Sequence, residues 1–216
     1  SDSSVIMGIL NVTPDSFSDG GQFDHVDKAV ERALEMEEQG AHIIDIGGES
    51  TRPGADSVNA LDEIDRVVPV IEKISQFSDI PISIDTSKSV VMEVALRSGA
   101  SMVNDVNALQ EAGAIEICKQ LDVPVCLMHM QGLPRMMQED PVYKDVVAEV
   151  SDFLTQRAEH CIKKGIAKEH IILDPGFGFG KTLTHNLLLL KHYDVFCGLN
   201  FPVMMGVSRK SMLGMI

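Results

Sequence analysis

The sequence lacks the features of several protein classes. It has no apolar run of about 18 residues and no charged-then-apolar pattern at its start, so we expect neither a transmembrane helix nor a signal peptide. No C-x-x-C pair is present, and we expect buried free thiols at Cys118, Cys126, Cys161 and Cys197. The sequence therefore predicts a cytoplasmic protein that folds without disulfides.

Basic residues are scarce: 18 Lys and Arg stand against 32 Asp and Glu, which gives a net charge of −14. An acidic surface repels phosphate backbones and anionic lipids, so neither nucleic acid nor a membrane is an expected partner. An anionic small substrate would need a local basic cluster. With 216 residues, 44% of them hydrophobic, the chain can bury a core as one domain or at most two small ones.

Strand-like and helix-like segments alternate along the chain. Short runs rich in Ile, Val and Met begin near Val5, Ala41, Pro81, Ser101, Pro124, His170 and Pro202. Amphipathic stretches lie between them, at 26–39, 59–77, 88–98, 112–120, 143–164 and 184–192. This alternation predicts a parallel sheet built from βα units, and a repeat of roughly 33 residues is typical of a (β/α) barrel, in which eight units take about 250 residues.

A doubly wound sheet is the rival architecture. It would normally carry a glycine-rich turn after its first strand, but residues 11–17 read Asn-Val-Thr-Pro-Asp-Ser-Phe. We therefore predict an α/β protein with a (β/α)8 TIM barrel. Seven strand-like runs are one too few, and residues 208–216 resemble the beginning of a helix. The expectation is one barrel domain over 1–216 from which the last helix and strand units are missing.

Polar residues follow most of the strand-like runs. Four of them are embedded in apolar sequence: Asp45, Asp85, Asn104 and Asp174. The carboxyl ends of barrel strands converge on the face that carries the active site, and buried carboxylates need partners, so we predict a shared ligand site. A helix cap remains the alternative for single residues such as Ser87 and Asp105. Carboxylates and Asn suit the N–H edge of an amino-pyrimidinone, at about 1.5–3 kcal/mol per charge-assisted bond.

Several segments could bind anions or a metal ion. Residues 50–54 contain a hydroxyl and the guanidinium of Arg52, and 208–211 form a helix start beside two cations. Gly178, Gly180 and Lys181 resemble half of a phosphate loop, although a plain turn is the commoner use. No histidine pair has the spacing of a helical zinc site, and His129 could serve either packing or a site. Mg²⁺ held mainly by substrate phosphates would leave no motif.

Two longer motifs carry a family resemblance. Residues 8–21, Gly-Ile-Leu-Asn-Val-Thr-Pro-Asp-Ser-Phe-Ser-Asp-Gly-Gly, resemble the first signature of the bacterial dihydropteroate synthases. Residues 45–54, Asp-Ile-Gly-Gly-Glu-Ser-Thr-Arg-Pro-Gly, resemble the second. Shorter matches follow in the family's order at 84–86, 104–105, 127–132, 174–181 and 208–211. The resemblance runs from about Val5 to the last residue.

The resemblance implies a pterin-binding (β/α)8 barrel and a transferase reaction. That family joins 6-hydroxymethyl-7,8-dihydropterin diphosphate to 4-aminobenzoate, giving 7,8-dihydropteroate and diphosphate in folate biosynthesis, and sulfonamides target it. Mg²⁺ is the implied cofactor, the two small molecules are the implied partners, and a homodimer is the usual assembly. No protein nucleophile is needed, because positioning and electrostatics suffice.

The resemblance also implies residue roles. The pterin would be held by Asp85, Asn104, Asp174 and Lys210. Its slot would be shaped by Met128 (or Met130), Phe179 and Gly206. Asn11 would supply the protein oxygen for Mg²⁺, and Thr51 and Arg52 would bind the diphosphate. The aminobenzoate pocket would be lined by Phe17, Pro53, Arg209 and Ser211. Catalysis would depend on the charges of Asp85, Lys210 and Arg52.

One family feature is missing, and two alternatives were weighed. The Arg-x-His motif expected on an eighth strand does not occur before the sequence stops. A related methyltransferase that passes a folate methyl group to a corrinoid would lack the 13–17 and 208–211 motifs, which are present here. A pterin-binding protein without activity should have lost Asn11, Arg52 or Lys210, and all three are present. The sequence leaves open the oligomeric state and any fused pterin pyrophosphokinase domain.

Overall fold

The computed structural model describes residues 4–13, 22–50, 57–132 and 141–207. The chain divides into two compact units. Unit 1 comprises Ser1–Ser50 and Asp56–Asn104, and unit 2 comprises Thr51–Ala55 and Asp105–Ile216. The expectation of a single domain stays a prediction.

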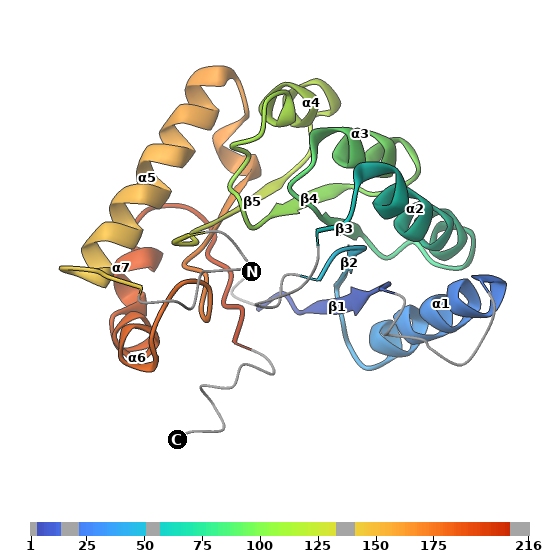
Figure 1. Cartoon of the computed structure of the whole chain (residues 1–216), viewed down its shortest axis with the longest axis horizontal. Helices are drawn as coiled ribbons and strands as arrows, with labels where there is room; N and C mark the ends of the chain where they lie inside the picture. Colours follow the sequence, from blue (N-terminus) through green and yellow to red (C-terminus); the bar gives the residue numbers. More distant parts are fainter. Residues whose placement is uncertain (1–3, 14–21, 51–56, 133–140, 208–216) are drawn as a thin grey trace. The chain divides into compact units, whose positions relative to one another are not determined.

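Unit 1 is a set of βα repeats with parallel strands. Its elements in chain order are β1 (Met7–Asn11), α1 (Gln22–Glu38), β2 (Ile43–Gly47), α2 (Ala60–Phe77), β3 (Ile82–Asp85), α3 (Ser89–Arg97) and β4 (Met102–Asp105). Strand β2 pairs with β1 and β3, and β3 pairs with β4, always in parallel. Helices α1, α2 and α3 follow one another beside these strands (Figure 1). The predicted alternation is confirmed in this unit.

Helix α2 shows how the sequence sets these elements. It starts after Asn59, whose side-chain oxygen accepts the backbone N–H of Asp62 at 2.9 Å and so satisfies a donor that the first helical turn leaves free. Its buried face consists of Glu63, Val67, Val70, Ile71 and Ile74, which recur at helical spacing. Four of these residues are apolar, so their burial favours the helix. Glu63 is the exception, and its partners lie in the site described below.

Unit 2 also alternates helices with parallel strands, and its helices range from 5 residues in α7 to 19 in α5. Its elements are α4 (Ala114–Leu121), β5 (Val125–Met128), α5 (Val146–Lys164), the 3-10 turn η2 (Lys168–His170), β6 (Ile171–Asp174), α6 (Leu183–Lys191) and α7 (Tyr193–Cys197). Strands β5 and β6 pair in parallel. Asp145 caps α5 by accepting two backbone N–H groups at 3.1 Å, and Gly165 ends it with a φ of 106°.

Two expectations differ from the structure in this unit. The run after Pro202 forms a single parallel bridge between Leu173 and Val203 within the described residues, where we expected a strand. The backbone bonds Leu173 N–H to Pro202 O (2.9 Å) and Met204 N–H to Leu173 O (2.8 Å) make this bridge. The second difference is α7, which was not predicted.

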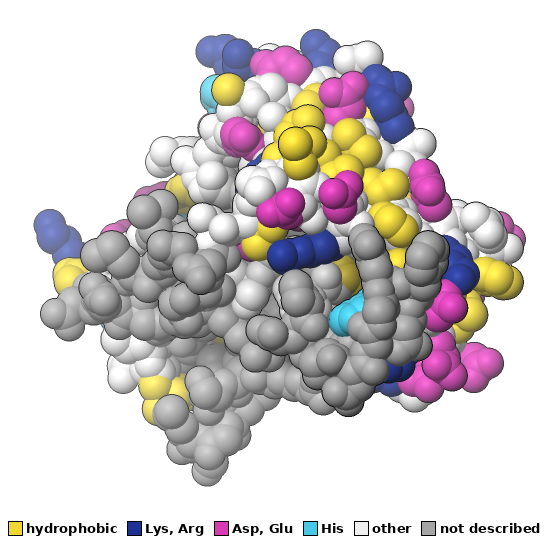
Figure 2. Space-filling model, turned by 45° about the vertical axis from the view of Figure 1, so that its right-hand side comes forward, with side chains coloured by type: hydrophobic (Ala, Val, Ile, Leu, Met, Phe, Trp, Pro, Cys, Tyr) yellow, Lys and Arg dark blue, Asp and Glu magenta, His cyan; other side chains and the backbone are white. Residues whose placement is uncertain are grey.

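The surface charge and the cysteines agree with most of the expectations drawn from the sequence. Figure 2 shows acidic side chains at several separate places on the face that it draws, as expected for a net charge of −14. None of the helices in the described ranges is long and apolar enough to cross a membrane. Cys118, Cys126 and Cys161 are buried free thiols as predicted, whereas Cys197 at the end of α7 is exposed, which corrects that expectation.

Candidate functional site

The carboxyl ends of the unit 1 strands place polar residues in one row. The strand register pairs Asn11 of β1 with Gly47 of β2, Gly47 with Asp85 of β3, and Asp85 with Asn104 of β4. Asn11 is exposed, while Asp85 and Asn104 are half-buried. Parallel pairing therefore brings together three of the residues that the sequence analysis assigned to the pterin and to Mg²⁺.

Gly47 lies between two of these side chains, and its lack of a Cβ atom lets both approach the backbone of β2 closely. A Cβ atom at this position would lie 3.3 Å from Asp85 Oδ2 and 3.6 Å from Asn11 Oδ1. Both oxygens therefore face the backbone of β2 at the same point. A carboxylate and an amide oxygen are ligands of the kind that Mg²⁺ prefers, and Mg²⁺ usually takes only one or two protein ligands beside water and phosphate oxygens. The donor set fits the ion, although the described residues contain no group of three or more acidic, His or Cys side chains that could hold a metal.

Asp45 lies deeper in the same unit, two residues before Gly47 on β2. Its side chain accepts the Asn104 Nδ2–H at 2.9 Å, and its register neighbour on β3 is Ser83. Asp45 is only 4% exposed, and burial raises its pKa to about 6, although the Ser83 hydroxyl and the Asn104 amide act in the opposite direction. Asp45 Oδ1 and Ser83 Oγ are buried with no hydrogen-bond partner of good geometry in the described part of the chain.

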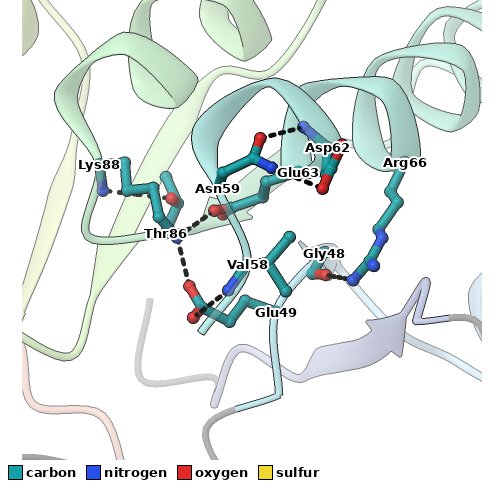
Figure 3. A network of polar contacts seen from close by, with 9 residues as sticks. All are labelled: Gly48, Glu49, Val58, Asn59, Asp62, Glu63, Arg66, Thr86 and Lys88. Atoms are coloured by element: carbon teal, nitrogen blue, oxygen red, sulfur yellow. Dashed lines mark hydrogen bonds and ion pairs between the residues drawn. The ribbon is translucent and has the colours of Figure 1, made fainter. Parts of the chain in front are cut away.

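A second polar network begins where β2 ends (Figure 3). Lys88, just before α3, points its ammonium group at two carboxylates and bonds to Glu49 and, at 2.5 Å, to Glu63 of α2. Burial opposes the charge on Lys88, but the hydrogen bonds to Glu49 and Glu63 outweigh it and raise the pKa of the lysine. Glu49 also accepts the backbone N–H of Val58 at 3.0 Å. This carboxylate therefore joins the residues on either side of the 51–56 segment.

The same network fixes the backbone that follows β2. Arg66 donates to the carbonyl oxygen of Gly48 at 2.8 Å. A Cβ on Gly48 would lie 2.9 Å from a methyl carbon of Val67, so α2 packs directly against this glycine.

The Glu63–Lys88 pair was not predicted from the sequence. The available signal was the position of Glu63, which is four residues before Val67 and seven before Val70 on the apolar face of α2.

In unit 2, Asp174 ends β6 beside Met128, its register neighbour at the end of β5. Asp174 is 6% exposed and accepts the backbone N–H of Gly176 at 2.8 Å. A Cβ on Gly206 would lie 3.5 Å from Asp174 Oδ2, so this glycine sits against the carboxylate. Unit 2 therefore brings together Asp174 and Gly206, with Met128 buried at the adjoining strand end and Phe179 half-buried in the turn that follows.

Lys181 is a buried cation that holds this turn. It is 2% exposed, and its Nζ lies 3.2, 2.9 and 3.0 Å from the carbonyl oxygens of His129, Gly176 and Phe179. It also lies 3.0 Å from His129 Nδ1. Lys181 therefore ties the residue after β5 to the turn after β6. The plain turn, which the sequence favoured over half of a phosphate loop, is what the structure shows, because the ammonium faces protein carbonyls.

His129 belongs to the same buried cluster. Burial, with the Lys181 ammonium as the second cause, lowers its pKa to about 3, so the ring is neutral and Nδ1 can accept a hydrogen bond from the Lys181 ammonium. The ring also meets Phe153 edge-on, with 5.0 Å between the ring centroids. Packing, the first of the two uses that the sequence left open for His129, is what the structure shows.

Close backbone approach explains two glycines of this turn. Gly176 has a φ of +70°, and a Cβ there would lie 2.0 Å from the carbonyl oxygen of His129. Gly180 has a φ of +61°, and its Cβ would lie 2.2 Å from the carbonyl oxygen of Gln131. Both positions require a residue without a side chain.

Asp105, for which the sequence left a capping role open, accepts the backbone N–H groups of Asn107 (2.8 Å) and Leu109 (2.7 Å). Its carboxylate therefore stabilises the turn that follows β4.

Seven of the residues assigned from the sequence lie outside the described ranges. They are Phe17, Thr51, Arg52, Pro53, Arg209, Lys210 and Ser211. Their roles stay predictions.

Comparisons with known proteins identify the family. Residues 7–216 match the family described as "Pterin binding enzyme". The dihydropteroate synthase of Haemophilus influenzae is 53% identical over 211 residues, which is 98% of this chain and 77% of that protein. The Escherichia coli dihydropteroate synthase is 51% identical over 98% of this chain and 75% of its own length.

Solved structures agree with these sequence matches. A Yersinia pestis dihydropteroate synthase in a sulfonamide drug complex has a TM-score of 0.91 at 50% identity, covering 98% of this chain and 77% of that one. A Xanthomonas albilineans dihydropteroate synthase with 4-aminobenzoic acid has a TM-score of 0.93 at 48% identity, covering 99% and 76%. The fold is thus the predicted (β/α) barrel class. The chain belongs to the pterin-binding enzymes and, among them, to the dihydropteroate synthase family of transferases.

Proposed function

We propose that this chain condenses 6-hydroxymethyl-7,8-dihydropterin diphosphate with 4-aminobenzoate to give 7,8-dihydropteroate and diphosphate, and that sulfonamides compete with 4-aminobenzoate. The observation that carries the proposal is the row of Asn11, Asp85 and Asn104 at one level of β1, β3 and β4, in a chain that is 53% identical to a dihydropteroate synthase. A Xanthomonas albilineans relative with 7,8-dihydropteroate, 44% identical with a TM-score of 0.89, supports the same product.

The pterin would be bound by Asp85, Asn104, Asp174 and Lys210. A carboxylate can accept two parallel N–H bonds from the amino-pyrimidinone edge, while Asn supplies both kinds of group and Lys donates to a ring oxygen or nitrogen. The half-burial of Asp85 and Asn104 supports this role, because a ligand can reach them. The residues proposed to shape the pterin slot are Met128, Phe179 and Gly206.

The diphosphate would be bound by Thr51 and Arg52, with Mg²⁺ on its oxygens. Asn11 is the proposed protein ligand of that ion, and the position of its Oδ1, which faces Gly47 beside the Asp85 carboxylate, supports this assignment. The bound ion would supply positive charge to the leaving group. The 4-aminobenzoate pocket would be lined by Phe17, Pro53, Arg209 and Ser211.

The reaction breaks the C–O bond between the pterin methylene and the diphosphate and forms a C–N bond to the amine of 4-aminobenzoate, which loses a proton. Positive charge develops on the pterin ring as diphosphate leaves. The Asp85 carboxylate would stabilise that charge, while Arg52 would stabilise the leaving anion and Lys210 would fix the ring. The protein supplies electrostatics and alignment, so no nucleophilic side chain is required.

Two further expectations remain part of this proposal. The family's usual homodimer is proposed for this chain, and light scattering of the purified protein would report its mass. A cytoplasmic, reducing environment is proposed, supported by the four free cysteines among the described residues.

The test is an assay of diphosphate release with and without 4-aminobenzoate. Release should require both substrates and fall at least 100-fold in Asp85→Ala, which removes a charge at the carboxyl end of β3. Asp79→Ala is the matched control, because Asp79 is exposed before the amino end of the same strand and should leave the rate unchanged. Release that ignores 4-aminobenzoate, or full activity in Asp85→Ala, would contradict the proposal.

A further inference from the structure

We propose that Asp45 is a positioning residue that orients the side-chain amide of Asn104 for the pterin. This inference rests on the proposed function, because it assigns Asn104 to the ligand. It adds a residue that does not itself touch the substrate.

The contact has a defined direction. Asn104 Nδ2 lies 2.9 Å from Asp45 Oδ2. An ionised carboxylate can only accept hydrogen bonds, so the amide must turn its N–H₂ end toward Asp45. The carbonyl end of Asn104 then faces away from the carboxylate. Asp45 thereby decides which end of the amide is available as an acceptor for a ring N–H group.

The two residues differ in their access to a ligand. Asp45 is 4% exposed, whereas Asn104 is half-buried in the row formed by the strand ends. Asp45 pairs in register with Ile9 and Ser83, two residues before the row that contains Asn104. A pterin at the strand ends can therefore contact Asn104, while Asp45 acts through it.

The energetics of Asp45 do not favour a purely structural role. Its Oδ1 is buried without a hydrogen-bond partner of good geometry among the described residues, and so is Oγ of Ser83, its register neighbour. A buried carboxylate with an incomplete set of partners costs stability, and an apolar residue of similar size would be tolerated as well or better. A residue that is costly to the fold and aimed at a ligand-binding side chain is typical of a site optimised for function.

The test measures the dissociation constant of 6-hydroxymethyl-7,8-dihydropterin by calorimetry, together with the denaturant midpoint of each variant. Asp45→Leu should weaken pterin binding at least 10-fold while its midpoint stays equal or rises. Asp45→Asn, whose carbonyl still accepts from Asn104, should stay within about threefold of the wild type. Ser83→Ala is the matched buried control and should bind normally. In turnover, Asp45→Leu should raise KM for the pterin substrate more than it lowers kcat.

A double-mutant cycle isolates the route of the effect. In an Asn104→Ala background, Asp45→Leu should cause no further loss of affinity. An equal loss in that background, or wild-type affinity in Asp45→Leu, would overturn the inference and leave the proposed function intact. A wild-type chain that binds no dihydropterin would instead overturn both. If Asp45→Leu does not fold, Asp45→Ser, which is too short to reach Asn104, takes its place in the cycle.

Discussion

Units 1 and 2 each remove one lysine from water, and they balance its charge differently. Lys88 in unit 1 lies between the carboxylates of Glu49 and Glu63, with 24% of its side chain exposed. Lys181 in unit 2 is 2% exposed, and three backbone carbonyls and a neutral imidazole surround its ammonium group. Unit 1 therefore matches charge with charge, whereas unit 2 solvates a cation with dipoles.

The difference decides what a substitution leaves behind. Loss of Lys88 removes the cationic partner of the Glu63 carboxylate. The Glu63 side chain is fully buried, and its Oε1 has no hydrogen-bond partner in the described residues. Loss of Lys181 leaves carbonyl groups of two different segments without their common donor. Buried unpaired groups are costly in both cases, but only the first case leaves an uncompensated charge that a second substitution can remove.

The largest effect is expected for Lys181→Met. It should lower the free energy of unfolding by about 4 kcal/mol, because several buried acceptors lose their donor at about 1–3 kcal/mol each. Chemical denaturation gives the value. Lys191→Met, at an exposed position of α6 in the same unit, is the control and should change little. Equal midpoints for the two variants would show that the carbonyl cluster does not depend on the ammonium group.

A smaller loss, about 3 kcal/mol, is expected for Lys88→Met, because water still reaches the partly exposed Glu49 carboxylate, although the Glu63 carboxylate stays buried. Unlike the loss at Lys181, this one should be recovered in part by a second change. Lys88→Met combined with Glu63→Leu should be more stable than the sum of the two single effects predicts, as a double-mutant cycle would report. Simple additivity would contradict the pairing shown in Figure 3.

The two units should also respond to pH with opposite signs. The pKa of Asp45 is about 6 in the fold against an ordinary 3.8, so its contribution to stability is lost as pH rises from about 4 through 6. The pKa of His129 is about 3 against an ordinary 6.5, so its contribution is lost as pH falls below about 6.5. Each change is on the order of 3 kcal/mol between pH 4 and 7.

Two variants that do not titrate separate these effects. Relative to the wild type, Asp45→Asn should become more stable as pH rises from 4 to 7. His129→Asn, whose oxygen can replace Nδ1 as an acceptor for Lys181, should become relatively more stable as pH falls over the same range. Stability curves that run parallel to the wild type would show that neither burial shifts proton binding.

The smallest effect is expected for Gly47→Ala. Its Cβ would lie 3.3 Å from Asp85 Oδ2, so the carboxylate must move by a few tenths of an ångström, and KM for the pterin substrate should rise by about three- to tenfold. Gly198→Ala, directly after α7, meets a backbone oxygen at the same 3.3 Å and is the matched control for crowding away from the strand ends. Equal KM values in both variants would argue against a ligand role for this end of β3.

The sequence predicted the parts of the molecule that local patterns determine. The apolar run around Asp45 indicated β2. Polar residues at run ends indicated Asp85 and Asn104, because parallel strands align their carboxyl ends, whereas Asn11 was assigned through the family resemblance. The seventh run failed as a strand within the described residues because strand formation depends on pairing, and only the Leu173–Val203 bridge forms. The number of residues that pair as a strand depends on the neighbouring strand as well as on the segment's own sequence.

The partners of Lys88 and Lys181 could not be predicted from local sequence patterns either. Glu63 and Lys88 are 25 residues apart, and only the apolar face of α2 hinted that this carboxylate is buried. Lys181 followed a glycine-rich turn and was compared with a phosphate loop. Its partners are backbone carbonyls, which any sequence can supply, so no residue pattern could have identified them.

The central claim is the proposed one, that the Asp85 carboxylate at the carboxyl end of β3 binds the pterin. Calorimetric titration of the wild type and Asp85→Ala with 6-hydroxymethyl-7,8-dihydropterin tests it most directly. We expect clear binding to the wild type and at least 30-fold weaker binding to the folded variant. Undiminished binding to Asp85→Ala, or no heat with the wild type, would contradict the claim.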